Sequence, residues 1–450
     1  MKMILCIGLA ALTTGLRGQS TDAWDLKTLM QGALEGNYEL AIANYEAELT
    51  ELELGDPTSE LLPQINFTSS YFNYLLEVPQ YIFTGEEGSI ISGGTGVQNY
   101  PVELGLKHNL TADLSLRQRI FDVRFFGREV GKNELANLSN SRFDEKKNEV
   151  ATEVAETYYR LKWVQSNQAI IAFNVERLNQ LMAIVRRQIS NQMATPFDSA
   201  RLSKEIRALA IRDQQVADNR ALLLRRLRQL CKLPLDVETN LLTSLEAPLL
   251  APTPSTEIVV SPQAKTLNYA VSLNELQQKA TRLSGVPTLD VFGHLFLQSQ
   301  SPSINVIGDG FWNNLSTLGL QLSVPIYNGE KLHRETQKLK LEASLLELQR
   351  QRLSEGELLQ LQRLQSDLQF ERSNLLLEED WLQQLTGELD LQQRRFEQQL
   401  IGISELLQSQ SDVSASQQKI NQHLLEIRLI EIAVLKAQGL LAESILANEE

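Results

Sequence analysis

The chain has 450 residues and a formal net charge of −14 at pH 7. That acidity argues against a nucleic-acid-binding surface, which is normally basic. Beyond the N-terminus, no run approaches the roughly 18 apolar residues that a membrane-spanning helix needs.

The N-terminus predicts a signal peptide. Lys2 precedes an apolar run over residues 3–16, which is too short to cross a bilayer. Gly18 and Ser20 are small residues of the kind found at cleavage sites. We therefore expect residues 1–20 to be removed and the protein to be exported, with an uncleaved N-terminal anchor as the alternative.

The first half of the mature chain opens with an expected helix over residues 25–54. Apolar and polar residues alternate from about residue 64, and again up to about residue 121. This alternation predicts a β-hairpin over about 64–121. Its two strands are separated by a long loop over residues 76–105, for which we predict no role.

A helical period then takes over, with apolar residues at i, i+3 and i+4 over about 128–190. Pro196 suits the first turn of a returning helix, which we expect to run to Cys231. Four prolines then indicate a linker over residues 235–266.

The second half repeats this order. A helix is expected from Asn268, a hairpin over about 288–326 with its second strand over 318–326, and helices over about 329–447. The first of these helices spans about 70 residues, or about 105 Å. Leucines recur in it every seven residues, which alone would suit a generic coiled coil: Leu361, Leu368, Leu375, Leu382 and Leu389.

The two halves align with an offset of roughly 206 residues, far longer than a solenoid repeat, which indicates a duplicated domain. The expected organisation is a signal peptide, a first structural repeat, a linker and a second structural repeat, at residues 1–20, 21–234, 235–266 and 267–450.

No motif points to catalysis or to a cofactor. Cys6 lacks the small neighbours of a lipoprotein cleavage box and would leave with the signal, so Cys231 has no disulfide partner. Ser416 and Lys419 fit a Ser-x-x-Lys pattern inside a helix-rich polar run, which does not favour an enzyme. The histidines lack metal-ligand spacing, so no metal site is predicted: His108, His294, His333 and His423.

Four stretches together resemble the TolC family of outer-membrane efflux and secretion channels. Leu62-Pro63-Gln64-Ile65 and residues 286–289 resemble its strand entries, residues 320–331 (LQLSVPIYNGEK) its strand-to-helix stretch, and residues 395–407 (RFEQQLIGISELL) its helix-turn tip. The resemblance covers nearly the whole mature chain.

The resemblance implies a mainly α fold with a transmembrane β part. Three chains would form a homotrimer whose α-barrel continues into a twelve-strand β-barrel. The protein would lie in the outer membrane of a Gram-negative bacterium, in contact with its lipid, and extend into the periplasm. It would work with a periplasmic adaptor and an inner-membrane pump, as the passive exit channel of a tripartite efflux or type I secretion system.

Glu405 and Asp198 match the family's tip acids, so the resemblance makes them candidates for a gate or a selectivity ring. Three like charges near a constriction favour cations. The alternative is that both are ordinary acids in the first turn of a helix, where they stabilise the helix dipole.

Four more residues are candidate tip or adaptor contacts by the same resemblance: Gln192, Gln399, Gly402 and Pro196. The chain departs from the family at Gln192 and Gln399, where glycine is usual. Phe396 stands where many members carry tyrosine, so we expect no hydroxyl-mediated latch there. The alternative function is an exported periplasmic coiled-coil scaffold or adaptor without a pore.

Overall fold

The computed structural model describes residues 25–54, 61–75, 80–85, 98–103, 105–232 and 261–447. The predicted signal peptide and most of the predicted linker lie outside these residues. The chain forms two compact units. The first comprises Met1–Glu48, Leu138–Asn268 and Leu348–Glu450, and the second comprises Leu49–Asn137 and Tyr269–Glu347.

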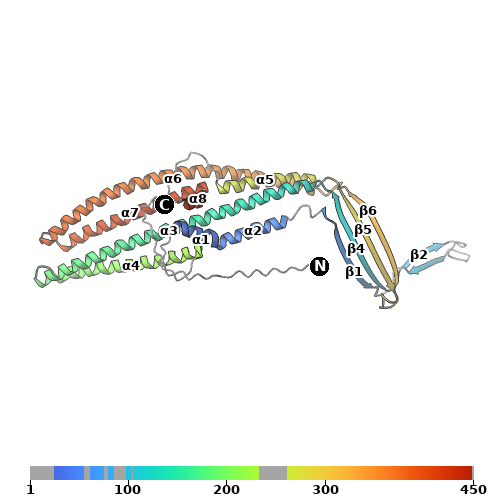
Figure 1. Cartoon of the computed structure of the whole chain (residues 1–450), viewed down its shortest axis with the longest axis horizontal. Helices are drawn as coiled ribbons and strands as arrows, with labels where there is room; N and C mark the ends of the chain where they lie inside the picture. Colours follow the sequence, from blue (N-terminus) through green and yellow to red (C-terminus); the bar gives the residue numbers. More distant parts are fainter. Residues whose placement is uncertain are drawn as a thin grey trace. The chain divides into compact units, whose positions relative to one another are not determined.

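The two halves of the chain share an order of initial helix, two sheet strands, long helix and return helix (Figure 1). The first half adds α2, β2 and β3 to this order, and the second half adds α8. Helices α3 and α6 each span 67 residues, about 100 Å, and helices α4 and α7 each span 36. In chain order the elements are α1 (Leu26–Gly36), α2 (Tyr38–Leu54), β1 (Gln64–Asn73), β2 (Gln80–Gly85), β3 (Gln98–Glu103), β4 (His108–Phe121), α3 (Arg124–Ser190), α4 (Pro196–Cys231), α5 (Pro262–Leu283), β5 (Thr288–Ser301), β6 (Phe311–Ser323), α6 (Lys331–Glu397), α7 (Ile403–Gln438) and α8 (Leu441–Ala447).

The second unit contains a four-stranded antiparallel sheet in the order β1-β4-β5-β6 (Figure 1). Strand β6 begins earlier than the predicted strand over 318–326 and ends at Ser323, because Pro325 cannot donate to a ladder. The long loop predicted over 76–105 contains a second antiparallel pair, β2 and β3.

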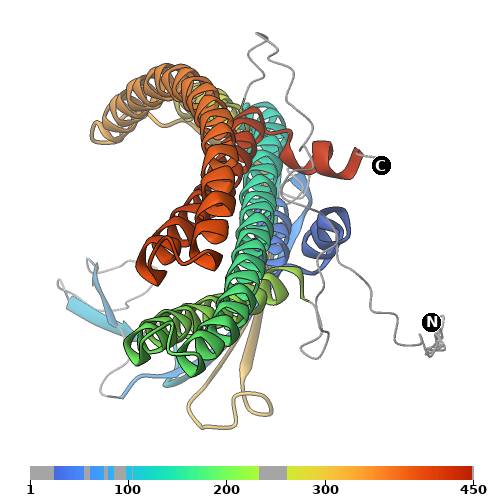
Figure 2. The ribbon, with the colours of Figure 1, turned by 90° about the vertical axis from the view of Figure 1, so that its left-hand side faces the viewer.

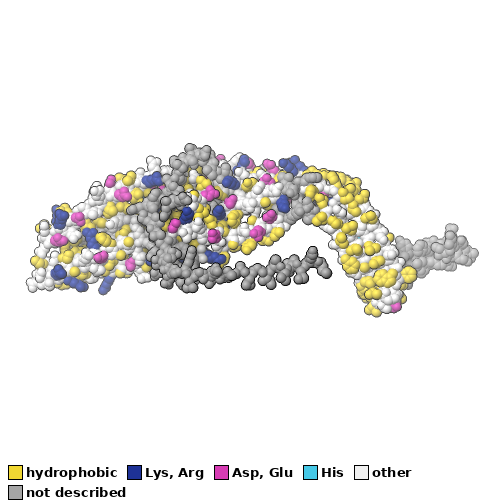
Figure 3. Space-filling view, viewed as in Figure 1, with side chains coloured by type: hydrophobic (Ala, Val, Ile, Leu, Met, Phe, Trp, Pro, Cys, Tyr) yellow, Lys and Arg dark blue, Asp and Glu magenta, His cyan; other side chains and the backbone are white. Residues whose placement is uncertain are grey.

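The sheet has two chemically different faces. On β6, Leu318, Leu320 and Leu322 are 80%, 67% and 66% exposed. Register places them beside Gly293, Val291 and Leu289 of β5. Figure 3 shows hydrophobic side chains gathered over the strands. The opposite face is mostly polar but also carries Phe292, Phe296 and Leu315. Its polar side chains, strand by strand, include Asn66, Thr68, Asp113, Arg117, Asp290, His294, Thr317 and Gln321.

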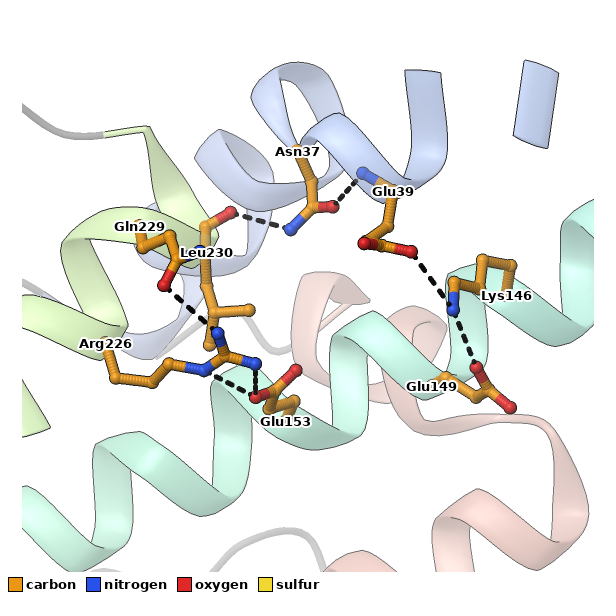
Figure 4. A network of polar contacts seen from close by, with 8 residues as sticks. All are labelled: Asn37, Glu39, Lys146, Glu149, Glu153, Arg226, Gln229 and Leu230. Carbon is orange, nitrogen blue, oxygen red and sulfur yellow. Dashed lines mark hydrogen bonds and ion pairs between the residues drawn. The ribbon is translucent and has the colours of Figure 1, made fainter. Parts of the chain in front are cut away.

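The helix predicted over residues 25–54 is broken at Asn37, and this corrects the sequence expectation. The Asn37 carboxamide accepts the backbone N–H of Glu39 at 2.8 Å, which caps the start of α2. Its Nδ2 donates to the carbonyl oxygen of Leu230 on α4 at 3.0 Å. A contact between residues far apart in sequence therefore fixes the break (Figure 4).

Ion pairs around this break join α2 and α4 to α3 (Figure 4). The Lys146 ammonium lies 3.4 Å from Glu39 and 3.3 Å from Glu149. The hydrogen bond to Glu149 is the main reason that the pKa of Lys146 is raised. Arg226 of α4 donates to the Glu153 carboxylate of α3.

Two other helix ends differ from the expected ones. Helix α5 starts at Pro262 rather than Asn268, because Ser261 Oγ accepts the N–H of Ala264 at 3.0 Å and proline suits the first helical position. The return helix expected to reach residue 447 ends at Gln438, because Gly439 takes the left-handed conformation with φ 70°.

The first unit is held by a core in which α1, α3, α4, α7 and α8 meet. Tyr158, Leu161 and Ile432 are fully buried there. Charge is buried as well: Glu431 on α7 lies 2.6 Å from Arg428 and 3.2 Å from Arg372 of α6. Buried carboxylates are tolerated when they are paired in this way.

Lys162 is a buried cation in the first unit. It is 5% exposed, and its ammonium lies 4.6 Å from the ring centroid of Tyr158. Burial lowers its pKa to about 8; the charge of Asp25 opposes this shift and that of Arg428 adds to it. Below pH 8 the folded protein therefore keeps the positive charge of Lys162 in a buried position. In the unfolded chain water hydrates the same ammonium group.

We expect Lys162→Met to raise the free energy of unfolding at pH 7 by about 2 kcal/mol. The unfolded chain binds more protons than the folded one between pH 8 and 10.5, so the wild-type protein becomes more stable across that window and the gain of the variant shrinks. Unfolding of the purified protein at a series of pH values measures this. Lys146→Met removes a half-exposed lysine and should give no gain. A gain that is constant with pH would contradict the explanation.

Candidate functional site

The two helical hairpins of the first unit end in turns of the same geometry. The N–H of Gln192 donates to the carbonyl oxygen of Ile189 at 3.0 Å, and that of Met193 to Gln188 at 2.8 Å. In the other hairpin the N–H groups donate over the same spacings and distances, with Gln399 and Leu400 as donors and Phe396 and Arg395 as acceptors. This is the Schellman pattern of helix ends. We call these two turns, residues 191–195 and 398–402, the hairpin ends (Figure 2).

Gln192 and Gln399 are the left-handed residues of these turns, with φ 61° and 62°. Glycine is the usual residue at such a position because a Cβ atom makes the conformation unfavourable. The structure therefore keeps the glycine-type turn at both hairpin ends although glutamine occupies the position.

Asp198 is engaged in capping helix α4. Its Oδ2 accepts the backbone N–H of Thr195 at 2.9 Å and the Thr195 hydroxyl at 2.7 Å. Pro196 occupies the first helical position, where its missing N–H has no cost. These contacts are those of the alternative interpretation, in which the acid stabilises a helix start.

Glu405 occupies the equivalent position in α7, but its surroundings differ. The residue that caps α7 is Gly402, which has no side chain to reach the carboxylate. Glu405 is exposed, and within the described part of the chain its side chain has no hydrogen bond or ion pair. Of the two predicted acids, Glu405 is thus the one whose carboxylate is exposed to solvent and makes no contact with another described side chain.

The hairpin ends and the adjoining first turn of α4 also expose apolar side chains that sequence analysis did not select. Met193, Phe197 and Leu400 are exposed, and the Arg201 guanidinium lies 5.3 Å from the Phe197 ring centroid. Beneath them the four helices bury a compact cluster that includes Phe396. The only signal for Met193 and Leu400 was an apolar side chain inside a turn.

A cleft of about 500 Å³ lies between α4 and α7, just beyond the hairpin ends. Neither Asp198 nor Glu405 lies on its wall, and neither do Gln192, Gln399 or Gly402. Its residues come from both return helices: Phe197, Ala200, Arg201, Lys204, Glu205, Ser404, Leu407, Gln408 and Ser411. The wall thus combines two cations and one acid with neutral polar and apolar side chains.

The described residues contain no group of three or more His, Cys, Asp or Glu side chains placed to hold a metal ion. No helix in the same part of the chain is long and apolar enough to cross a membrane. Burial raises the pKa of the Cys231 thiol to about 12, so this cysteine is a poor nucleophile.

No family model matches the sequence, and no curated protein matches it. Solved structures do match. CusC, described in connection with transmembrane channel formation, is 14% identical, with 92% of each chain covered and a TM-score of 0.73. VceC, an outer membrane protein of Vibrio cholerae, is 13% identical, with 92% of this chain and 96% of VceC covered and a TM-score of 0.70. The chain has the outer-membrane channel fold.

A third example of this fold is the CmeC outer membrane channel of Campylobacter jejuni. It is 15% identical and has a TM-score of 0.69, and the match covers 97% of this chain and 94% of CmeC. The outer-membrane channel fold confirms the resemblance found in the sequence, and with it the expectation of a mainly α fold with a β part.

We expect Gln399→Gly to stabilise the protein by about 1 kcal/mol, because glycine adopts the left-handed conformation without the Cβ penalty. Thermal unfolding of the purified protein measures it. The matched control is Gln384→Gly in the exposed interior of α6, which should cost about 1 kcal/mol. If the two variants shift stability in the same direction, the turn at Gln399 is not strained.

Proposed function

We propose that this chain is the outer-membrane exit channel of a tripartite efflux or type I secretion system. It would conduct substrates passively from the periplasm or an inner-membrane pump to the outside. The observation that carries the proposal is the two-faced sheet of the second unit. One face of its strands exposes leucines and the other is mostly polar, as expected for a wall between lipid and an aqueous pore.

The dimensions of the strands support this proposal. Strands β5 and β6 have 14 and 13 residues, or about 45 Å at about 3.3 Å per residue. A tilt of about 45° reduces this to about 30 Å, the thickness of the hydrocarbon core. The leucine face would then be covered by lipid.

The edges of the sheet support a homotrimer. Strands β1 and β6 are the edges of the four-stranded sheet. Unpaired backbone groups cannot remain in lipid, so the sheet has to close on other chains. In the proposed trimer, three copies form a barrel of twelve strands, with β6 of one chain beside β1 of the next.

The helices would extend into the periplasm. Helices α3 and α6 are each about 100 Å long, which suits an α-barrel that reaches toward an inner-membrane pump. The exposed apolar side chains at the hairpin ends and the cleft behind them would meet a periplasmic adaptor. Pro196, Gly402, Gln192 and Gln399 are proposed to belong to the same contact surface, since all four are exposed at or beside the hairpin ends.

The competing function is an exported coiled-coil scaffold without a pore. In a water-soluble scaffold the leucine face of the sheet would have to be covered by other protein surface. Leaving an apolar face of this kind exposed to water is costly. No catalytic role is proposed, because a duct needs no chemistry and its energy would come from its partners.

The native mass of the detergent-extracted protein tests the proposal, after outer and inner membranes have been separated. A trimer in the outer-membrane fraction that forms cation-conducting pores in planar bilayers is the expected result. A soluble monomer or dimer in the periplasm would overturn the channel and leave the scaffold.

We further propose that Glu405 contributes to a ring of three carboxylates near the inner end of the duct. A carboxylate about 4 Å from a passing ion is worth about 1 kcal/mol in water, so Glu405→Ala should lower the cation-to-anion permeability ratio about fivefold. Reversal potentials in a salt gradient measure it. Glu443→Ala on α8 removes an exposed carboxylate elsewhere and should leave the ratio unchanged. Equal ratios for wild type and Glu405→Ala would exclude the ring.

Asp198 is proposed as a second member of the ring, with its carboxylate already committed to Thr195. The two hydrogen bonds from Thr195 weaken the electrostatic attraction that the Asp198 carboxylate exerts on a passing cation. Asp198→Asn should therefore change the permeability ratio less than Glu405→Ala does. The same reversal potentials decide the order, and a larger effect at Asp198 would reverse our assignment.

A further inference from the structure

A second cleft, of about 430 Å³, lies in the second unit where strand β6 leads into helix α6. Arg282 lies in the last turn of α5 and Gly285 follows that helix, and the first turns of α6 supply Leu332, His333 and Thr336. The connection between strand and helix, from Pro325 to Glu330, completes the wall. This cleft has no part in the function argued above.

Apolar surface leads directly into this cleft. The exposed leucines of β6 are followed by Val324, which is 49% exposed, and by Ile326, which is 94% exposed. Tyr327 is 80% exposed and adds a ring with a hydroxyl group. The cleft is therefore continuous with the leucine face of the sheet, along one strand and its extension.

The cleft carries charges of both signs. Arg282 is exposed, and no described residue pairs with its guanidinium through a hydrogen bond or an ion pair. His333 shares the wall, while Lys331 and Arg334 lie on the same first turns of α6. The acids are Glu330 on the wall and Glu335 on the same turns of α6. An unpaired arginine fork beside an apolar surface is suited to a phosphate group that carries acyl chains.

The position of the cleft fits the edge of a bilayer. Ile326 follows Leu322 by four residues, at most about 13 Å along the chain. The headgroup layer begins where the hydrocarbon core ends and is about 5–7 Å thick on each side. If Leu322 lies at the end of the hydrocarbon core, a strand tilt of about 45° places Ile326 at most about 9 Å beyond it. The cleft that Ile326 and Arg282 line then lies at the headgroup layer or its water-facing edge.

We propose that this cleft binds the headgroup of an anionic phospholipid. Arg282 binds the phosphate, the Tyr327 hydroxyl and His333 are further donors, and the acyl chains lie along Ile326 and the leucines of β6. The orientation relative to the bilayer rests on the proposed function.

Native mass spectrometry of the purified protein tests the proposal by counting bound lipids per chain. The probes are phosphatidylglycerol and phosphatidylcholine with the same acyl chains. We expect the wild type to retain more phosphatidylglycerol, and Arg282→Gln to weaken that binding about fivefold without changing phosphatidylcholine. Lys279→Gln removes an exposed lysine three positions earlier on α5 and should change neither lipid.

Three results would overturn the proposal. One is equal retention of the two lipids by the wild type, or equal effects of Arg282→Gln and Lys279→Gln. Another is that inorganic phosphate alone displaces phosphatidylglycerol at millimolar concentration, which would make this a site for soluble phosphate. The third is that Arg282→Gln dissociates the oligomer while the lipid count is unchanged, which would place a second copy of the chain in the cleft.

The outcome also separates this inference from the proposed function. An outer-membrane trimer whose lipid binding does not depend on Arg282 would refute the lipid site alone. A protein that is absent from the outer membrane and binds neither lipid would refute both.

Discussion

The pairing of strand β4 with strand β5 is the interaction on which the sheet depends. It joins strands from the two halves of the chain over the whole length of both. Asp290 of β5, which is almost fully buried, lies 2.7 Å from Arg117 and 3.2 Å from Arg119 of β4. Arg119 also reaches Asp122 at 3.0 Å, directly before helix α3 begins. Two separate hairpins would each be marginal, so this pairing makes one sheet and fixes where α3 leaves it.

One sheet of four strands leaves two problems that the chain does not solve alone. Strands β1 and β6 remain as edges, and the leucines of β6 remain exposed. Pairing between copies of the chain would satisfy the backbone groups of the edge strands, and lipid would cover the leucines. Both features therefore support the proposed membrane-embedded oligomer. The leucine face and the Arg282 cleft then belong together, because an apolar surface that ends beside an unpaired arginine matches the chemistry of a phospholipid from chain to headgroup.

The hairpin ends show how a similar backbone is used in two ways. Gln192 and Gln399 adopt the same left-handed turn, and an acid follows each at the third position of the next helix. Thr195 before α4 binds Asp198, whereas Gly402 before α7 leaves Glu405 in solvent. The difference in the capping residue alone separates an acid that stabilises a helix from one that is available to ions or to a partner.

The sequence by itself determined the helices, most of the strands and the fold resemblance, because hydrophobic period and proline act locally: the leucines of α6 and the alternation of β6 needed no neighbour to be interpreted. Other features depended on residues far apart in sequence. Asn37 breaks the first helix through the carbonyl of Leu230, Lys162 has a lowered pKa because other helices bury it, and Arg282 meets His333 only where α5 and α6 come together. Only the tertiary structure decided these, since burial and pairing across such distances leave no periodic trace in the chain.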